Sequence, residues 1–458
     1  MELDIEPRDQ LNAFTQATLA RRGGVRRVLL LLVTAVLGVR LFAFIHRYAV
    51  NVLFFDQWDF WAGMMRGDGL WTLFTTQLGP CREGVGFLVT RLSALASGWD
   101  SKVEAYVVGG LFVVGCGLAF AIKWRLTRRW SMFDVCIPLV LFTVGNLEAY
   151  VGTVNPAHGP VPMLLLLALV YARLRPRDAV RAAATLILHF ALVFTGFGVC
   201  FAPIGVGLLA LDLAAAIRER TKVVAPALAF LGSIATLALF ARHYVFQPAV
   251  PCFVFPDPHP LVYLSFVARL WLRSLQLDDL RRAALLLAGV PLFCASLWLL
   301  LYGALGTLRS WGESRRHETV FTLCAFSWAF AVATAVGRAC LGSAASHSSR
   351  YVSYTLLQLF AAYVAVQTSA LKEPFKRSLL SFCLLLFVVK EVRTDHTLGE
   401  AIWYADGKQH WRDCYRETED AALCNRRTGF VVYPDGTGRT IEPQLRYLEQ
   451  HHLNLFKE

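Results

Sequence analysis

Two carboxylates in an aromatic segment are the strongest candidates for chemistry in this chain. Asp56 and Asp59 lie three residues apart in the stretch FFDQWDFW, so they share one face if the stretch is helical. A carboxylate that is partly desolvated among aromatic rings has a raised pKa unless a cation pairs with it. Such a group suits a general base or a ligand for a hard divalent cation. The alternative is an amphipathic helix at a membrane interface that turns its polar residues toward water.

Further acidic candidates come from two other segments. Glu83, in the sequence CREG, either contacts a substrate or forms an exposed ion pair with Arg82 that has little consequence. Glu148, in the sequence NLEAY, lies near the predicted membrane surface, where ionisable residues are usually functional or paired. His158 follows at a turn and fits a turn residue better than a ligand. We therefore expect Glu83 and Glu148 to bind substrate.

The cationic candidates occur together late in the chain, in GRACLGSAASHSSRY at residues 337–351. We expect this segment to face outward, and short outer loops seldom carry arginine without a use. The guanidinium groups of Arg338 and Arg350 can bind phosphate in a bidentate manner, and Tyr351 directly follows Arg350. The alternative is that these arginines only reach toward lipid phosphates. We expect Arg338, Arg350 and Tyr351 to bind substrate.

The composition places these residues in a membrane protein. The chain is 56% hydrophobic and only 17% charged, with a mean hydropathy of +0.48. Several apolar runs approach the roughly 20 residues that a membrane-spanning helix needs. The net charge of +12 comes from short basic clusters between the apolar runs. This pattern is typical of cytoplasmic loops that face anionic lipid, and it argues against nucleic acid as a partner.

We predict an all-α, polytopic bundle of about eleven spans. The spans are expected near residues 28–46, 104–122, 133–148, 158–173, 181–196, 199–217, 223–242, 283–306, 319–337, 352–370 and 377–391. The stretch 181–217 must be two helices, with the break near Gly196, because a single helix would place the next basic cluster outside.

The basic clusters predict the orientation of the bundle. The segment 1–27 ends in arginines and should be cytoplasmic, and the first span should remain as an uncleaved anchor. An odd number of spans places the C-terminus outside. We therefore expect a transmembrane bundle over 28–390, with outer loops at 47–103 and 243–282, and a small extracytoplasmic cap over 391–458. The cap should be helical, with a turn at residues 434–436.

One apolar segment does not fit a simple span. Residues 261–277 carry Arg269 and Arg273 four positions apart on one helical face. We interpret this segment as a helix on the outer interface that directs both arginines toward lipid phosphates. A tilted or half-inserted span remains the alternative.

Most of the eleven cysteines lie in apolar runs, where they serve as small packing residues. The sequence has no CxxC, so a zinc site has no support. Cys414 and Cys424 form the one pair in the polar tail. Because an outward tail meets an oxidising compartment, we predict a disulfide between them.

Taken together, these segments resemble the GT-C type of multi-pass membrane glycosyltransferase, and more closely a group of uncharacterised bacterial membrane proteins related to it. The resemblance rests on FFDQWDFW after the first span, CREG before the second, the turn NLEAYVG, the late loop with GR and SRY, and the tail from WRDCYRETED to YLEQHHLNLF. It covers most of the chain, although each motif is short.

The resemblance implies a sugar transferase at the outer face of the cytoplasmic membrane, with a polyprenyl-phosphate sugar as donor. It implies that Asp56 is the catalytic base toward the acceptor, that Asp59 is a second acid, and that Arg338 and Arg350 hold the phosphate of the donor. Many members carry adjacent acids or an acid-x-acid triplet, whereas this chain has Asp-x-x-Asp. This departure puts a divalent cation in doubt more than it does base catalysis.

Two other classes of function remain open at this point. A transporter or lipid flippase would need ionisable residues near the middle of the bilayer, where Asp212 and His189 are the clearest candidates. Both lie near the predicted inner ends of their spans. Because charge concentrates at the outer face, the sequence favours an enzyme. The third class is a membrane scaffold without chemistry.

Overall fold

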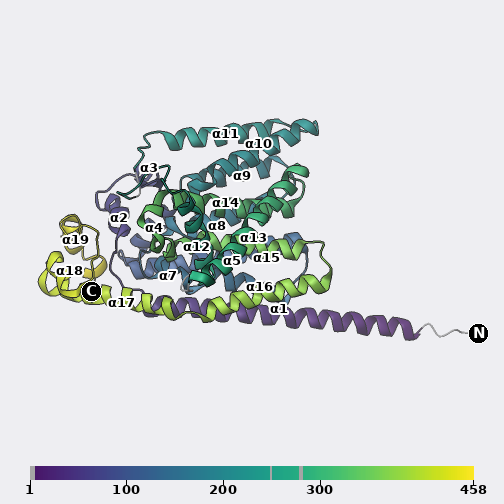
Figure 1. Cartoon of the computed structure of the whole chain (residues 1–458), viewed down its shortest axis with the longest axis horizontal. Coiled ribbons are helices and arrows are strands. Elements are labelled where there is room, and N and C mark those ends of the chain that lie inside the picture. Colours follow the sequence, from purple (N-terminus) through teal and green to yellow (C-terminus); the bar gives the residue numbers. More distant parts are fainter. Residues whose placement is uncertain (1–5, 248–249, 278–281, 458) are drawn as a thin grey trace, which may run out of the picture.

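The structure, a computed structural model, describes residues 6–247, 250–277 and 282–457. These residues form helices almost throughout (Figure 1). The two strands, β1 (Gln77–Leu78) and β2 (Cys81–Arg82), form one short antiparallel hairpin. The predicted all-α class is therefore confirmed. Residues 1–5 of the predicted cytoplasmic segment, and residues 248–249 and 278–281 of the second outer loop, lie outside the described part of the chain.

Seven helical segments of the described chain are long and apolar enough to cross a membrane, in agreement with the prediction of a polytopic protein. They are Gly24–Tyr48, Ser101–Thr127, Met132–Tyr150, Gly196–Arg218, Val224–Ala241, Leu287–Arg309 and Arg315–Leu341. The elements that contain them are α1 (Glu6–Tyr48), α5 (Ser101–Thr127), η1 (Met132–Val135), α6 (Cys136–Leu141), η2 (Val144–Asn146), α7 (Leu147–Tyr150), η4 (Gly196–Phe201), α10 (Ala202–Arg218), α11 (Val224–Ala241), α13 (Arg282–Arg309), α14 (Arg315–Arg338) and η5 (Ala339–Leu341).

Four more helices occur where the sequence predicts further spans, but they do not meet that standard of length and apolarity. They are α8 (Pro160–Arg173), α9 (Ala179–Val193), α15 (Val352–Thr368) and α16 (Glu373–Val392). The predicted break in 181–217 is confirmed, because α9 ends before η4 begins. Gly196 has a φ of +51°, and a Cβ there would lie 1.8 Å from the carbonyl oxygen of Ala157. Only glycine allows this close approach.

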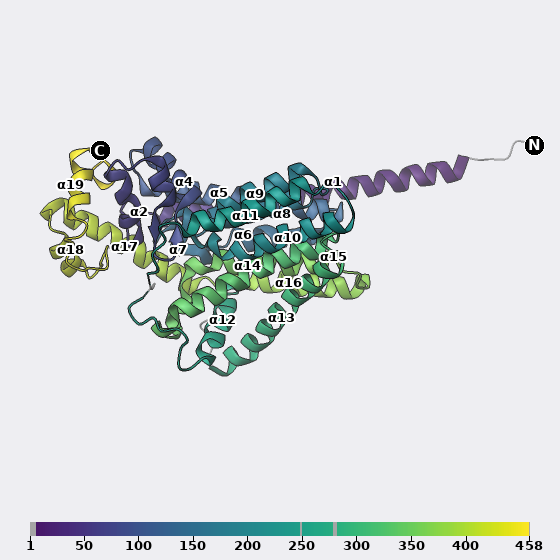
Figure 2. The same ribbon diagram turned by 90° about the horizontal axis from the view of Figure 1, so that it is seen from above.

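A cap forms at the end of the bundle remote from the N-terminus (Figures 1 and 2). It consists of α17 (Asp395–Thr418), α18 (Ala421–Thr428), α19 (Glu442–Gln450) and η8 (Asn454–Phe456), and it includes the predicted turn, where the Gly436 N–H donates to the carbonyl of Tyr433. The helices α2 (Asp56–Met65), α3 (Leu70–Thr75) and α4 (Gly84–Ser97) share a buried core with the cap. Trp58 and Trp61 of α2 share a buried core with Trp411 and Leu445 of the cap.

Two disulfide bonds lie at the cap end of the bundle. Cys414 and Cys424 are joined as the sequence suggests, with Cα atoms 5.7 Å apart. A second disulfide joins Cys252 to Cys340, whose Cα atoms are 5.9 Å apart. Sequence analysis did not anticipate this pair, because the two cysteines are separated by 88 residues and lie in no shared motif.

We expect Cys414 and Cys424 to resist thiol labelling in unfolded, unreduced protein. Alkylation in denaturant followed by mass spectrometry measures this, and Cys294, which is exposed and unpaired, supplies the positive control. Replacing both tail cysteines with serine should lower the stability of the cap by about 2–3 kcal/mol, since the bridge closes a short loop. Full labelling of the tail pair without reductant would contradict the bridge.

The helix α12 (Leu261–Ser274) corrects one expectation. Arg273 does not point toward lipid phosphates, because its side chain is 3% exposed and lies 3.3 Å from the Glu400 carboxylate of α17. Arg269, on the same face, is half-buried. Arg273 is held inside the protein by the cap helix α17. No local pattern in the sequence indicates that α17 lies beside α12.

Two arginines of the predicted cytoplasmic clusters are also buried. Arg173 and Arg181 are 2% and 1% exposed at the ends of α8 and α9. Arg173 lies 2.9 Å from Asp212 and 2.5 Å from Glu318, and Arg181 lies 3.0 and 3.3 Å from the same two carboxylates. These charges therefore tie α8, α9, α10 and α14 together instead of facing anionic lipid.

Candidate active site

Arg350 is the centre of the candidate site. It lies in η7 (Ser349–Tyr351), a short turn that leads directly into α15. Its Nη1 is 3.1 Å from Oδ2 of Asp56, and its Nη2 is 2.6 Å from Oε1 of Glu148. Three residues that the sequence singled out separately are thus in direct contact. One guanidinium between two carboxylates leaves this group with a net negative charge.

Glu148 is held by the loop that carries Arg350. The Ser348 hydroxyl donates to Oε2 of Glu148 at 2.8 Å, and the Glu148 N–H donates to the Ser349 hydroxyl at 3.0 Å. Since Glu148 is 6% exposed, these contacts fix its orientation and explain why a buried carboxylate is tolerated. Glu148 acts on Arg350, so its structural role is to orient that side chain.

Asp56 and Asp59 both lie in the first turn of α2, as their spacing predicts. The helix is amphipathic, with Trp58 and Trp61 fully buried while Asp59 is exposed. Oδ1 of Asp59 accepts a hydrogen bond of 2.9 Å from the Tyr433 hydroxyl of the cap. Partial desolvation of its carboxylate raises the pKa of Asp59, the Tyr433 hydrogen bond opposes this, and the charge of Asp56 adds to the rise.

Glu83 forms a second polar pair instead of an exposed ion pair with Arg82. It is fully buried, and its Oε1 lies 3.3 Å from Nε2 of His158 in η3 (Pro156–His158). Arg82 is buried too, and its guanidinium donates to the carbonyl oxygens of Phe240 and Arg242. The alternative of an exposed Arg82–Glu83 ion pair is wrong, because Arg82 contacts backbone carbonyls and Glu83 contacts His158.

Arg338 ends α14 and lies beside Tyr351, with its Cζ 6.0 Å from the ring centroid. Within the described part of the chain it forms no ion pair, unlike Arg350. Burial raises the pKa of the Tyr351 phenol, and the charges of Arg338 and Arg350 lower it. The charges of Glu148 and Asp56 raise it further. Tyr351 is therefore within electrostatic reach of both arginines and both carboxylates.

Aromatic contacts connect the Glu83–His158 pair to the helix that follows Arg350 and Tyr351. The ring of Phe197 lies 5.3 Å from His158 and 5.6 Å from Tyr354, which is one turn beyond Tyr351 in α15. The predicted site residues thus come from α2, α7, α14 and η7 and from Glu83, which lies between β2 and α4, and they gather at the cap end of the bundle. The direct contacts involve Asp56, Glu148 and Arg350, whereas Glu83 belongs to the neighbouring pair.

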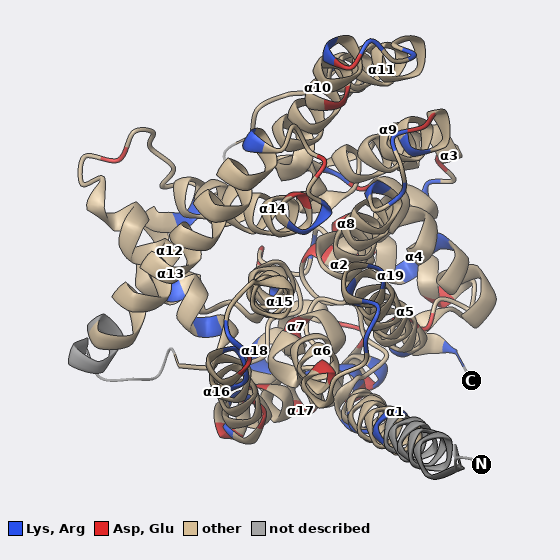
Figure 3. Cartoon of the chain, turned by 90° about the vertical axis from the view of Figure 1, so that its right-hand side faces the viewer, with Lys and Arg blue, Asp and Glu red and all other residues tan. Residues whose placement is uncertain are grey.

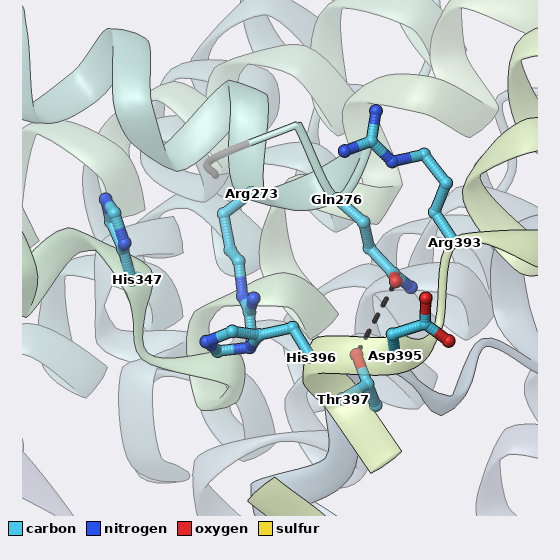
Figure 4. A pocket seen from close by; sticks show the side chains of 7 residues that line it. All are labelled: Arg273, Gln276, His347, Arg393, Asp395, His396 and Thr397. Carbon is cyan, nitrogen blue, oxygen red and sulfur yellow. Dashed lines mark hydrogen bonds between the residues drawn. The ribbon is translucent and has the colours of Figure 1, made fainter. Parts of the chain in front are cut away.

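A cavity of about 240 Å³ opens next to the loop that carries Arg350 (Figure 4). It is lined by Arg273, Gln276, His347, Arg393, Asp395, His396 and Thr397. His347 lies three residues before Arg350, in η6 (Ser343–His347). In Figure 4 the Gln276 side chain faces Thr397, with which it forms a hydrogen bond of 3.5 Å. Two arginines and two histidines line the cavity beside Asp395, and the carboxylate of Glu400 lies 3.3 Å from Arg273 and 3.8 Å from His396.

Sequence analysis missed the residues that the cap contributes. Lys408 of α17 is buried, donates to the carbonyl of Gly152 at 2.7 Å, and lies 5.4 Å from the ring centroid of Phe54. Burial lowers the pKa of Lys408 to about 7. Tyr433 contacts Asp59, as described above. Both lie in a polar tail whose periodicity gives no sign of contact with residues 47–103.

Among the described residues, no group of three or more His, Cys, Asp or Glu side chains is placed to hold a metal ion. No family model, curated protein or solved structure matches the chain. The site is therefore defined by its contacts alone.

Proposed function

We propose that the protein is a GT-C type glycosyltransferase of the cytoplasmic membrane. It would transfer a sugar from a polyprenyl-phosphate donor to an acceptor at the outer face. The observation that carries the proposal is the contact of Arg350 with Asp56 and Glu148, which supports a carboxylate held in a fixed position where the bundle meets the cap. Arg338, which has no carboxylate partner among the described residues, supports an anionic donor.

In this proposal Asp56 is the general base. It accepts the proton of the acceptor hydroxyl while the hydroxyl oxygen attacks the anomeric carbon of the donor. The bond between that carbon and the phosphate oxygen breaks, and polyprenyl phosphate leaves with the bonding electron pair. Direct displacement inverts the anomeric centre. Asp56 remains 35% exposed at its side chain, which leaves it open to an acceptor.

The contacts of Arg338 and Arg350 differ, so we assign the two arginines different roles. Arg350 is engaged by two carboxylates, so we assign it the positioning of Asp56. Arg338 has no carboxylate partner among the described residues, which favours it as a ligand for the departing phosphate. Asp59 supports Asp56 through its negative charge, and Tyr351 contributes a phenol between the two arginines.

The orientation of the bundle is part of the proposal. Eleven spans would cross the membrane if α8, α9, α15 and α16 are added to the seven long segments. The disulfides 252–340 and 414–424 lie at the cap end, in support of an oxidising outer side there. Lys and Arg residues line a cavity at the other end, as a cytoplasmic face requires.

We expect a reporter that is active only in the cytoplasm to be silent when fused after residue 458. The same reporter inserted in the loop at residues 369–372 should be active, because that loop lies at the end of the bundle opposite the cap. Reporter activity in living cells, normalised to the amount of fusion protein in the membrane, gives the comparison. The reverse pattern would invert the topology and place the proposed site on the wrong side.

The function itself is tested by turnover. Purified protein in detergent is incubated with radiolabelled polyprenyl-phosphate hexoses and a crude acceptor fraction from the outer side of the cell envelope. We expect release of polyprenyl phosphate together with labelled acceptor. Heat-inactivated protein is the control and should give neither product. If vesicles reconstituted with the protein instead move the donor between leaflets without breaking it, the glycosyltransferase proposal fails.

That second outcome corresponds to a transporter or flippase, which one observation favours. Arg40 of α1 pairs with Glu391 of α16, and Lys390 lies 2.9 Å from the same carboxylate. Lys390 and Glu391 are 1% and 7% exposed, so this pair lies inside the bundle, where ionisable groups often mark a transport path. The Arg40–Glu391 pair also links α1 to α16.

A further inference from the structure

A large cavity lies at the end of the bundle opposite the cap. Its volume is about 750 Å³. It is bounded by the loops that follow α5, α13 and α15, and by the start of α16. A volume in this range accommodates a small-molecule ligand or a lipid headgroup. The cavity is independent of the proposed active site.

The lining of this cavity is strongly basic. Seven Lys or Arg residues and a single Glu contribute to it. The basic residues are Lys123, Arg125, Arg129, Arg315, Arg316, Lys376 and Arg377. Figure 3, which looks onto this end of the chain, shows Lys and Arg segments around α14 and α15. Such a concentration of like charge is unfavourable unless anions balance it.

Carboxylates balance only part of this charge. Lys123 lies 2.7 Å from Asp134, which leaves that pair neutral. Arg315 lies 3.7 Å from Glu318, a carboxylate that two buried arginines already share. Glu373 lies 3.8 Å from both Lys376 and Arg377, so one acid serves two cations.

Three of the arginines have no carboxylate partner in the described part of the chain. The guanidinium of Arg125 lies over the ring of Tyr171, with Cζ 4.4 Å from the centroid. Arg316 donates to the carbonyl oxygen of Thr368 at 3.1 Å, which orients it along the wall. Arg129 is exposed at the rim. Hydroxyl and amide side chains complete the lining, among them Ser131, Ser369 and Gln367.

We propose that this cavity binds an anionic ligand that carries two phosphate groups. Guanidinium groups bind phosphate oxygens in pairs, and the surrounding hydroxyl groups supply further donors. Two phosphates match the excess of cations over the carboxylates that contact them better than one phosphate does. Basic pockets between membrane helices bind phosphate-rich lipid headgroups in the same manner. The ligand is either such a headgroup or a soluble diphosphate.

The test compares two probes on purified full-length protein in detergent. Tetraoleoyl cardiolipin represents the lipid source and inorganic pyrophosphate the soluble source, with dioleoyl phosphatidylcholine as a zwitterionic reference. Native mass spectrometry measures bound lipid, and isothermal calorimetry measures pyrophosphate. We expect saturable binding of cardiolipin or of pyrophosphate, and we expect Arg129→Gln/Arg316→Gln to weaken it tenfold or more.

The matched control is Arg128→Gln. Arg128 adjoins Arg129 and is exposed, but it does not line the cavity, so binding should change less than twofold. Arg377→Gln provides a second variant that should keep the fold, since its side chain is 74% exposed, and it should weaken binding about threefold. Binding of cardiolipin alone assigns a headgroup, and binding of pyrophosphate assigns a soluble ligand. Absence of saturable binding of both probes, or equal losses in Arg128→Gln and the cavity variants, overturns the proposal.

Discussion

Replacement of Asp56 by asparagine is expected to lower the rate of sugar transfer by about 100-fold or more, the usual scale for loss of a positioned base. The amide preserves the shape of the side chain and can still accept a hydrogen bond from Arg350. Folding, membrane insertion and the KM for the donor should therefore change little. The measurement is kcat for release of polyprenyl phosphate by purified wild type and variant in detergent.

Two matched variants separate the role of Asp56 from a general effect of charge. Asp68→Asn removes a partly exposed carboxylate that follows α2 in the chain and lies 2.8 Å from Arg66, and it should leave kcat within twofold. Asp59→Asn should cost less than Asp56→Asn, because Asp59 only supports its neighbour. Equal rates for Asp56→Asn and wild type would reject Asp56 as the base and favour the transporter.

Arg350 provides a further distinction within the same assay. Lysine keeps the charge but cannot contact Asp56 and Glu148 with two separate nitrogens. If Arg350 positions the base, Arg350→Lys lowers kcat with little change in KM. If it binds the donor phosphate, as the sequence alone indicated, the variant mainly raises KM. The structure leads us to expect the first result, with the larger KM effect at Arg338→Lys.

Glu318→Gln is expected to destabilise the bundle by about 3–5 kcal/mol, the scale for removing one partner from a buried ion pair. Glu318 is 3% exposed and contacts both Arg173 and Arg181. The amide leaves two buried guanidinium groups with Asp212 as their main balancing charge. Thermal unfolding in a fixed detergent, followed by circular dichroism, measures the change against wild type.

The control for this prediction is a surface carboxylate at the same end of the molecule. Glu219 lies 2.8 Å from Arg177 and its side chain is 39% exposed, so Glu219→Gln should cost less than about 1 kcal/mol. If Glu318→Gln unfolds at the same temperature as Glu219→Gln, the buried network contributes little to stability. The four helices would then be held by apolar packing alone.

The sequence by itself determined the all-α fold class of the protein. The length and composition of an apolar run are local properties, so the helical segments and the break at Gly196 could be located without any tertiary information. The amphipathic pattern of 54–61 placed Asp56 and Asp59 in one turn of α2, and the isolated pair in the polar tail pointed to the bridge between Cys414 and Cys424.

Only the tertiary structure decided which charges meet. Arg350 contacts Asp56 across 294 residues, and no periodicity relates the two positions. Arg173 and Arg181 looked like loop residues because clusters of arginine beside apolar runs usually are, yet their carboxylate partners come from α10 and α14. The same holds for Arg273 and Glu400, and for the disulfide between Cys252 and Cys340. A buried charge is tolerated only where a partner is brought to it, and that depends on how helices far apart in the chain pack together.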